Sequence, residues 1–134
     1  MIFTKSIKYP QTFDLISGST DIDDTTTSIN RCIALILTSA KCELLGDPDF
    51  GSRLYEMLFE QYSATLEAAI KAEIVEAITS FEKRVSVTED DVEIKESTNG
   101  IRNAYDVTIH YTITRTNRNE ETTVHLEEGE FYAK

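Results

Sequence analysis

The spacing of apolar residues changes once along this chain, at about Arg84, and this change constrains the fold more than any other feature of the sequence. Before it, apolar residues recur at intervals that place them on one face of a helix, as between Ile29 and Leu37. After it, apolar and polar residues alternate, as they do in a strand with one buried side. The pattern predicts helices in the first part of the chain and a sheet in the second.

The first predicted helix runs from about residue 22 to residue 38. It follows carboxylates within residues 21–24, which suit the positive end of a helix dipole. A short extended piece is expected at residues 44–45. Asp47 is expected in a turn, because the residue before a proline, here Pro48, avoids helical geometry.

A second helical pattern has Ser52 as its candidate N-cap and continues as far as Phe81. Residues 61–63 are expected to interrupt it, which gives two or three helices in total. The apolar residues that keep helical spacing after the interruption are Leu66, Ala69, Ile70, Ile74, Ala77, Ile78 and Phe81.

Strands are predicted around residues 85–87, 92–94, 105–114 and 122–126, with a tight turn at Asn99-Gly100. Short connections between such strands are typical of an antiparallel meander. The predicted fold class is therefore α+β, with two or three helices packed on a three- or four-stranded, mainly antiparallel sheet.

The register of the last hairpin can be narrowed from the sequence. Val124 and Leu126 must share a buried face with the apolar residues of the preceding strand, and a slip of one residue would turn every side chain to the other face. Only pairings with an odd sum of residue numbers meet this condition. A two-residue loop at 117–118 gives one such register, in which His110 lies opposite His125.

A chain of 134 residues has the size of one domain. We expect an N-terminal arm at residues 1–20, a single α+β domain at residues 21–127 and an acidic C-terminal tail at residues 128–134. Two alternatives stay open for the arm, which either lies over the domain or contacts a neighbouring subunit. The tail is either frayed or a docking segment.

The net charge of −11 argues against a direct nucleic-acid partner, because binding to phosphates depends on clustered Lys and Arg. No apolar run approaches the roughly 20 residues of a membrane-spanning helix, and the first residues lack the features of a signal peptide. We therefore expect synthesis in the cytoplasm, no membrane insertion and a protein partner. Cys32 and Cys42 cannot build a zinc site alone, and Cys32 is interpreted as a small core residue.

No catalytic, cofactor-binding or metal site is predicted. His110 and His125 are interpreted as solvent-face residues of the sheet, and they fall short of the three or four ligands that zinc needs. Four acids are embedded among apolar residues: Glu43, Glu56, Glu60 and Glu82. Nothing in the sequence distinguishes a protonated acid with an ionised partner among them, as a glycosidase would need.

Five short motifs follow one another in a specific order. They are Ile36-Leu37-Thr38, Cys42-Glu43, Pro48-Asp49-Phe50-Gly51, the segment from Leu54 to Phe59, and Glu82-Lys83-Arg84-Val85. By these motifs the chain resembles the small baseplate wedge proteins of contractile phage tails. That family includes the equivalent subunit of type VI secretion baseplates and has also been called lysozyme-like. The resemblance covers about residues 22–127.

The resemblance implies a structural protein, not an enzyme, present in several copies within a larger symmetric assembly. It implies partners among the baseplate wedge core proteins. It also implies that a strand edge pairs with the tail sheath protein and initiates sheath assembly, with residues 121–127 and the N-terminal arm as candidate edges. The expected location is the tail baseplate of a virion or an equivalent injection machine, assembled in the bacterial cytoplasm.

The resemblance further implies that Glu82 and Arg84, with Lys83 between them, form the interface with other wedge subunits. The alternative is a local salt bridge or helix-end cap. Lys83 stands where the family has proline, which frees a backbone N–H and loosens the junction. Cys42 stands where the family has glycine, which indicates a turn without positive φ.

Two other classes of function stay open on the sequence. A peptidoglycan-degrading glycosidase would turn over purified cell wall through one of the embedded glutamates. A small adaptor protein of another system would not co-purify with sheath or wedge proteins.

Overall fold

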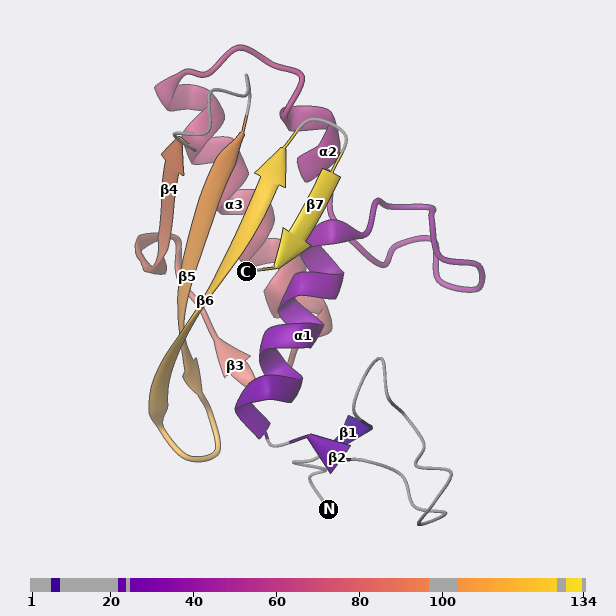
Figure 1. Cartoon of the computed structure of the whole chain (residues 1–134), viewed down its shortest axis with the longest axis vertical. Helices are drawn as coiled ribbons and strands as arrows, with labels where there is room; N and C mark the ends of the chain where they lie inside the picture. The colour runs from indigo at the N-terminus through magenta and orange to yellow at the C-terminus, as the bar shows by residue number, and fades with distance from the viewer. Residues whose placement is uncertain (1–5, 8–21, 24, 97–103, 128–129, 134) are drawn as a thin grey trace.

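The computed structural model describes residues 6–7, 22–23, 25–96, 104–127 and 130–133. The helices are α1 (Thr25–Thr38), α2 (Leu54–Met57) and α3 (Ala64–Phe81), with a 3₁₀ turn η1 at Glu89–Asp91. The strands are β1 (Ser6–Ile7), β2 (Ile22–Asp23), β3 (Val85–Ser86), β4 (Val92–Glu96), β5 (Tyr105–Ile113), β6 (Arg118–Glu127) and β7 (Glu130–Ala133). In Figure 1, α3 runs behind the main sheet and α1 packs beside it.

The main sheet is antiparallel and has the strand order β3-β5-β6-β7. Strand β4 also pairs with β5. Since β3 and β4 pair with successive parts of the same edge of β5, the sheet is four strands wide. The predicted α+β fold with helices on a mainly antiparallel sheet is confirmed. Strands β1 and β2 form a separate two-stranded ribbon.

In the hairpin of β5 and β6, the numbers of two paired residues add up to an odd number, as predicted, but the register differs from the predicted one. Val107 lies opposite Val124, and both face the core. His110, however, lies opposite Glu121 and not opposite His125. The predicted two-residue loop is wrong because the turn spans residues 114–117, where Asn117 takes a positive φ of 52° and its N–H donates to Ile113 O at 2.8 Å.

Strand β7 is an addition that the sequence pattern did not indicate. Residues 130–133 were assigned to a tail, yet they pair with β6 from Val124↔Ala133 to Glu127↔Glu130. The predicted open edge at residues 121–127 is therefore paired on both sides over 124–126, and Glu127 pairs with β7. The other candidate edge, the N-terminal arm, lies mostly outside the described residues, as does the turn predicted at Asn99-Gly100.

The helices differ from the predictions mainly at their ends. Helix α1 begins at Thr25 because Ile22–Asp23 belongs to β2. The predicted interruption at 61–63 is confirmed, and Ser63 caps α3 by accepting the N–H of Leu66 at 3.1 Å. Residues 44–45 lie among turns and bends of a loop and do not form an extended piece. No helix in the described part of the chain is long and apolar enough to cross a membrane.

Ser52 is the predicted N-cap of the second helix, but it does not cap α2. Instead, it links the end of α1 to the start of α2. Its hydroxyl donates to Leu37 O at the end of α1, at 3.1 Å, and its N–H donates to Ser39 O at 2.9 Å. Ser52 is buried, and the residue that precedes α2 is Arg53, which makes no side-chain cap. The serine therefore fixes the start of α2 against the end of α1.

The core lies between the two long helices and the sheet. The helices contribute Ile29, Ile33, Ile36, Leu37, Leu66, Ile70, Ile74, Ala77 and Ile78. The sheet contributes Val92, Tyr105, Val107, Ile109, Tyr111, Ile113, Val124 and Leu126. The helical spacing and the strand alternation read from the sequence are thus the two sides of one apolar core.

His125 was predicted on the solvent face, and this prediction is wrong. Its side chain is 1% exposed, and its Nδ1 lies 2.7 Å from Asp106 Oδ1 on β5. His110 is 44% exposed and agrees with the prediction. The two histidines point away from the core in the same sheet, but the register separates them.

Candidate functional site

The Glu82-Lys83-Arg84 motif forms the junction between α3 and β3. Glu82 leaves the helix in an extended conformation with φ −117° and ψ 95°. Its N–H still donates to Ile78 O at 2.8 Å, which completes the last helical hydrogen bond. Arg84 leads into β3, and its carbonyl oxygen accepts the N–H of Thr114 at 2.9 Å. The motif is therefore held at the point where helix becomes sheet.

Glu82 and Arg84 form a two-point ion pair, which we call the Glu82–Arg84 clamp. Arg84 Nε donates to Glu82 Oε1 at 2.8 Å, and Nη2 donates to Oε2 at 2.7 Å. The backbone N–H of Arg84 also donates to Oε1, at 3.1 Å. The guanidinium reaches α1, where it donates to Ser28 Oγ at 3.2 Å and to Cys32 Sγ at 3.4 Å. The clamp thus joins the α3–β3 junction to the first helix.

Burial and charge oppose each other in the clamp. The Glu82 side chain is 6% exposed and that of Arg84 24%. Burial raises the pKa of Glu82, but the hydrogen bonds and charge of Arg84 outweigh it and leave this pKa below its usual value. Hydrogen bonding to Glu82 raises the pKa of Arg84. Burial, followed by the charge of Glu82, raises the pKa of the Cys32 thiol, so the pair stays charged and the thiol stays protonated at neutral pH.

The structure contains the local salt bridge that is the alternative to a subunit interface at Glu82 and Arg84. The Glu82 carboxylate is directed into the molecule. Lys83 is exposed, and its Nζ donates to Thr79 O, on the last turn of α3, at 2.8 Å. A partner approaching this junction would therefore meet Lys83 and the exposed side of Arg84 rather than Glu82.

The other embedded acids lie in water rather than in apolar pockets. Glu43, Glu56 and Glu60 are exposed, and Glu43 Oε2 accepts the N–H of Ala40 at 2.8 Å. A glycosidase acid must stay protonated near neutral pH, which burial without a cation achieves. Glu82 is buried but has the opposite environment, because Arg84 holds it ionised. None of the four has the surroundings of a general acid.

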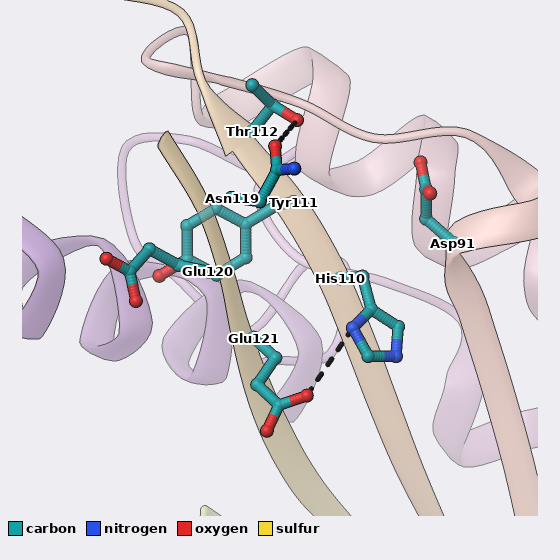
Figure 2. Close-up of a pocket in the computed structure, with 7 residues that line it drawn as sticks. All are labelled: Asp91, His110, Tyr111, Thr112, Asn119, Glu120 and Glu121. Carbon is teal, nitrogen blue, oxygen red and sulfur yellow. Dashed lines mark hydrogen bonds and ion pairs between the residues drawn. The ribbon is translucent and has the colours of Figure 1, made fainter. Parts of the chain in front are cut away.

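A polar hollow of about 390 Å³ surrounds His110 on the outer face of the sheet. Figure 2 shows its lining: Asp91, His110, Tyr111, Thr112, Asn119, Glu120 and Glu121. His110 Nδ1 lies 3.4 Å from Glu121 Oε2, and Nε2 lies 3.8 Å from Glu93 Oε1. Hydrogen bonds from Thr88 occupy the Asp91 carboxylate and lower its pKa. The described residues contain no group of three or more His, Cys, Asp or Glu placed to hold a metal ion.

A second hollow, of about 660 Å³, lies against the clamp, and we call it the basic groove. It is lined by Thr25, Thr26, Lys83, Arg84, Ile113, Thr114, Arg115, Thr116 and Arg118. The sequence did not indicate Arg115 and Arg118 as site residues. The predicted two-residue loop placed Arg118 in the turn, and nothing in the sequence placed either arginine near the Glu82-Lys83-Arg84 motif. Two arginines close together in an acidic half of the chain were the available signal.

The prediction for Cys42 is wrong, because this residue has a positive φ of 69°. Its N–H donates to Pro48 O at 2.8 Å, and the N–H of Glu43 donates to Ala40 O at 3.2 Å. Backbone hydrogen bonds therefore set the turn, whichever side chain stands there. The position keeps the left-handed geometry that suits glycine and imposes it on a cysteine.

Comparison with known proteins gives the class of the chain. Residues 23–118 match the model of a family described as "Baseplate wedge protein gp25". The match spans more than half of the chain, so this is a structural baseplate protein of the contractile-tail class. The chain belongs to the gp25 baseplate wedge family, as the resemblance implied. No match was found among curated proteins.

Solved structures share the fold. A Geobacter sulfurreducens protein described as a candidate tail lysozyme has a TM-score of 0.72 and 23% identity, covering 84% of this chain and 98% of that one. The baseplate of pyocin R2 after contraction contains a chain with a TM-score of 0.58 and 16% identity, covering 93% and 99%. A chain of the anti-feeding prophage baseplate has a TM-score of 0.62 and 15% identity, covering 94% and 86%. At these identities the likeness concerns the fold alone.

Proposed function

We propose that this chain is a baseplate wedge subunit that joins other wedge core proteins through Lys83 and the exposed side of Arg84. One observation carries the proposal. The clamp fixes Arg84 by hydrogen bonds to Glu82 and to α1, so the surface at the junction is preorganised before a partner arrives. In this arrangement Glu82 positions Arg84 and does not itself meet the partner.

Lys83→Glu tests this interface without breaking the clamp. Lys83 is exposed, so reversal of its charge should leave the fold intact and abolish co-purification with the wedge core proteins. Lys95→Glu is the matched control, because Lys95 is also exposed but lies on β4, away from the junction. Capture of wedge proteins by Lys83→Glu at the level of the control would refute the interface.

We further propose that β7 is the edge that pairs with a strand of the sheath protein. Charged side chains protect strand edges from pairing. Strand β4 reads Val-Glu-Ile-Lys-Glu, and the part of β6 beyond β7 reads Arg-Asn-Glu-Glu-Thr-Thr, so both carry several charges. Strand β7 reads Glu-Phe-Tyr-Ala, with one charged residue, and among the described residues it pairs with β6 only.

Two proline variants test this edge. Successive N–H groups of a strand point to opposite sides, so of Phe131→Pro and Tyr132→Pro one removes an N–H toward β6 and the other removes an N–H on the open edge. The variant that keeps the wild-type urea midpoint identifies the open side. We expect this variant to block co-assembly with the sheath protein, while alanine at the same position does not. Sheath assembly on the stable proline variant would contradict the proposal.

The remaining parts of the proposed function follow from the same class. The chain acts without an enzymatic step, in several copies of a symmetric baseplate assembled in the bacterial cytoplasm. The ionised state of Glu82 supports the absence of glycosidase chemistry. Turnover of purified cell wall by the chain, lost in Glu82→Gln, would overturn this part.

A further inference from the structure

The basic groove concentrates positive charge on a strongly acidic protein. The chain has 13 Lys and Arg against 24 Asp and Glu, yet four of the cations line this one hollow, and none of the described residues that line it is acidic. They come from separate places: Lys83 and Arg84 from the junction, Arg115 from the turn after β5, and Arg118 from the start of β6. Only the fold brings them together.

The charges of the groove are only partly neutralised. Arg84 is paired with Glu82, and Arg118 Nη2 lies 3.1 Å from Glu120 Oε1. Lys83 donates to a backbone carbonyl, which does not cancel its charge. Among the described residues, Lys83 and Arg115 have no carboxylate partner. The groove therefore keeps a local positive potential inside a negative molecule.

The shape of the groove favours a chain segment over a nucleic-acid duplex. A volume of about 660 Å³ lies within the roughly 300–1,000 Å³ range of sites for small ligands. Ile113 and the methyl groups of four threonines supply apolar contact beside the cations. The net charge of −11 opposes the approach of a long polyanion but permits a short acidic segment.

We infer that the basic groove binds an Asp- or Glu-rich segment of a partner protein, with Arg115 and Arg118 as its main carboxylate contacts. The planar guanidinium suits two-point hydrogen bonding to carboxylates. The inference rests on the proposed function for the identity of the partner, a wedge core protein, and on the groove alone for the binding chemistry.

A titration followed by amide chemical shifts tests the groove directly. The probe is a capped hexaglutamate peptide, added to the ¹⁵N-labelled full chain at low salt, with capped hexaglutamine as the neutral comparison. We expect saturable shifts at residues 114–116 and 25–26 with hexaglutamate only. Arg115→Ala/Arg118→Ala should weaken binding about tenfold, as expected for the loss of two charge pairs.

The matched control is Arg53→Ala/Lys95→Ala, which removes two exposed cations outside the groove and gives the same net charge. Equal weakening in both double variants, equal binding of hexaglutamine, or tighter binding of a six-residue thymidine oligonucleotide would overturn the inference. If hexaglutamate does not bind while Lys83→Glu still blocks capture of wedge proteins, the inference about the groove is refuted and the proposed interface stands. If hexaglutamate binds in the groove while Lys83→Glu captures wedge proteins normally, the proposed interface is refuted and the inference about the groove stands.

Discussion

Removal of the arginine from the Glu82–Arg84 clamp should destabilise the fold far more than removal of a surface arginine. In Arg84→Ala, Glu82 stays buried and loses both guanidinium hydrogen bonds, while the N–H of residue 84 and the Cys32 thiol remain as its donors. Breaking one side of a buried pair costs about 3–5 kcal/mol. Because the Arg84 side chain is 24% exposed, we take the lower end, about 3 kcal/mol at pH 7.

Arg118→Ala is the matched control for this prediction. Arg118 also pairs with a glutamate two residues away, Glu120, but its side chain is 68% exposed. Its loss should cost no more than about 1 kcal/mol. Urea unfolding followed by circular dichroism measures both changes. For a domain of this size the clamp variant should also melt roughly 10 °C below the wild type.

The pH dependence of the clamp variant should reverse in sign. In the wild type the lowered pKa of Glu82 adds stability above the unfolded-state pKa of about 4.3, and this stability is lost as pH falls through the folded-state pKa. In Arg84→Ala, burial without a cation raises this pKa, so the contribution is present below about 4.3 and lost as pH rises. The destabilisation should therefore shrink between pH 7 and pH 4. A loss no larger than in Arg118→Ala, or one independent of pH, would refute the reasoning.

Three further changes test the backbone and cap assignments by urea unfolding. Cys42→Gly should stabilise the fold by about 1 kcal/mol, since glycine relieves the positive φ, and no gain would argue against the left-handed turn. Gly51→Ala should lower the free energy of unfolding clearly more than Gly46→Ala. Both glycines have positive φ, but only at Gly51 would a Cβ lie 2.4 Å from Ser39 O. Equal losses in the two variants would contradict this contact. Ser63→Ala should cost about 1 kcal/mol through the lost cap of α3, whereas Ser63→Thr should retain most of it.

The parts of the fold that depend on local periodicity could be predicted from the sequence. Helical spacing predicted α3, and alternation predicted β5 together with the parity of its pairing with β6. Parity left several registers open, and the choice depended on the length of the turn at residues 114–117. That length is set by hydrogen bonds to Arg84 O and Ile113 O, which the hairpin sequence alone does not show.

Contacts between distant segments could not be predicted in the same way. The family motif drew attention to Glu82 and Arg84, but not to the contacts of the guanidinium with α1. The burial of His125 depends on the register that brings Asp106 beside it. The basic groove likewise exists only because the turn after β5 folds back onto the α3–β3 junction.

The closed base of the loop at residues 40–50 makes its tip a site for engineering. Hydrogen bonds from Ser52 to Leu37 and Ser39 fix both ends of this loop, independently of what lies between them. At the tip, Leu45 is 99% exposed, and a Cβ on Gly46 would have nothing within 4 Å. A peptide tag inserted after residue 45 should therefore project into solvent and leave the domain folded. Such a tag would allow the subunit to be located within an intact assembly by microscopy.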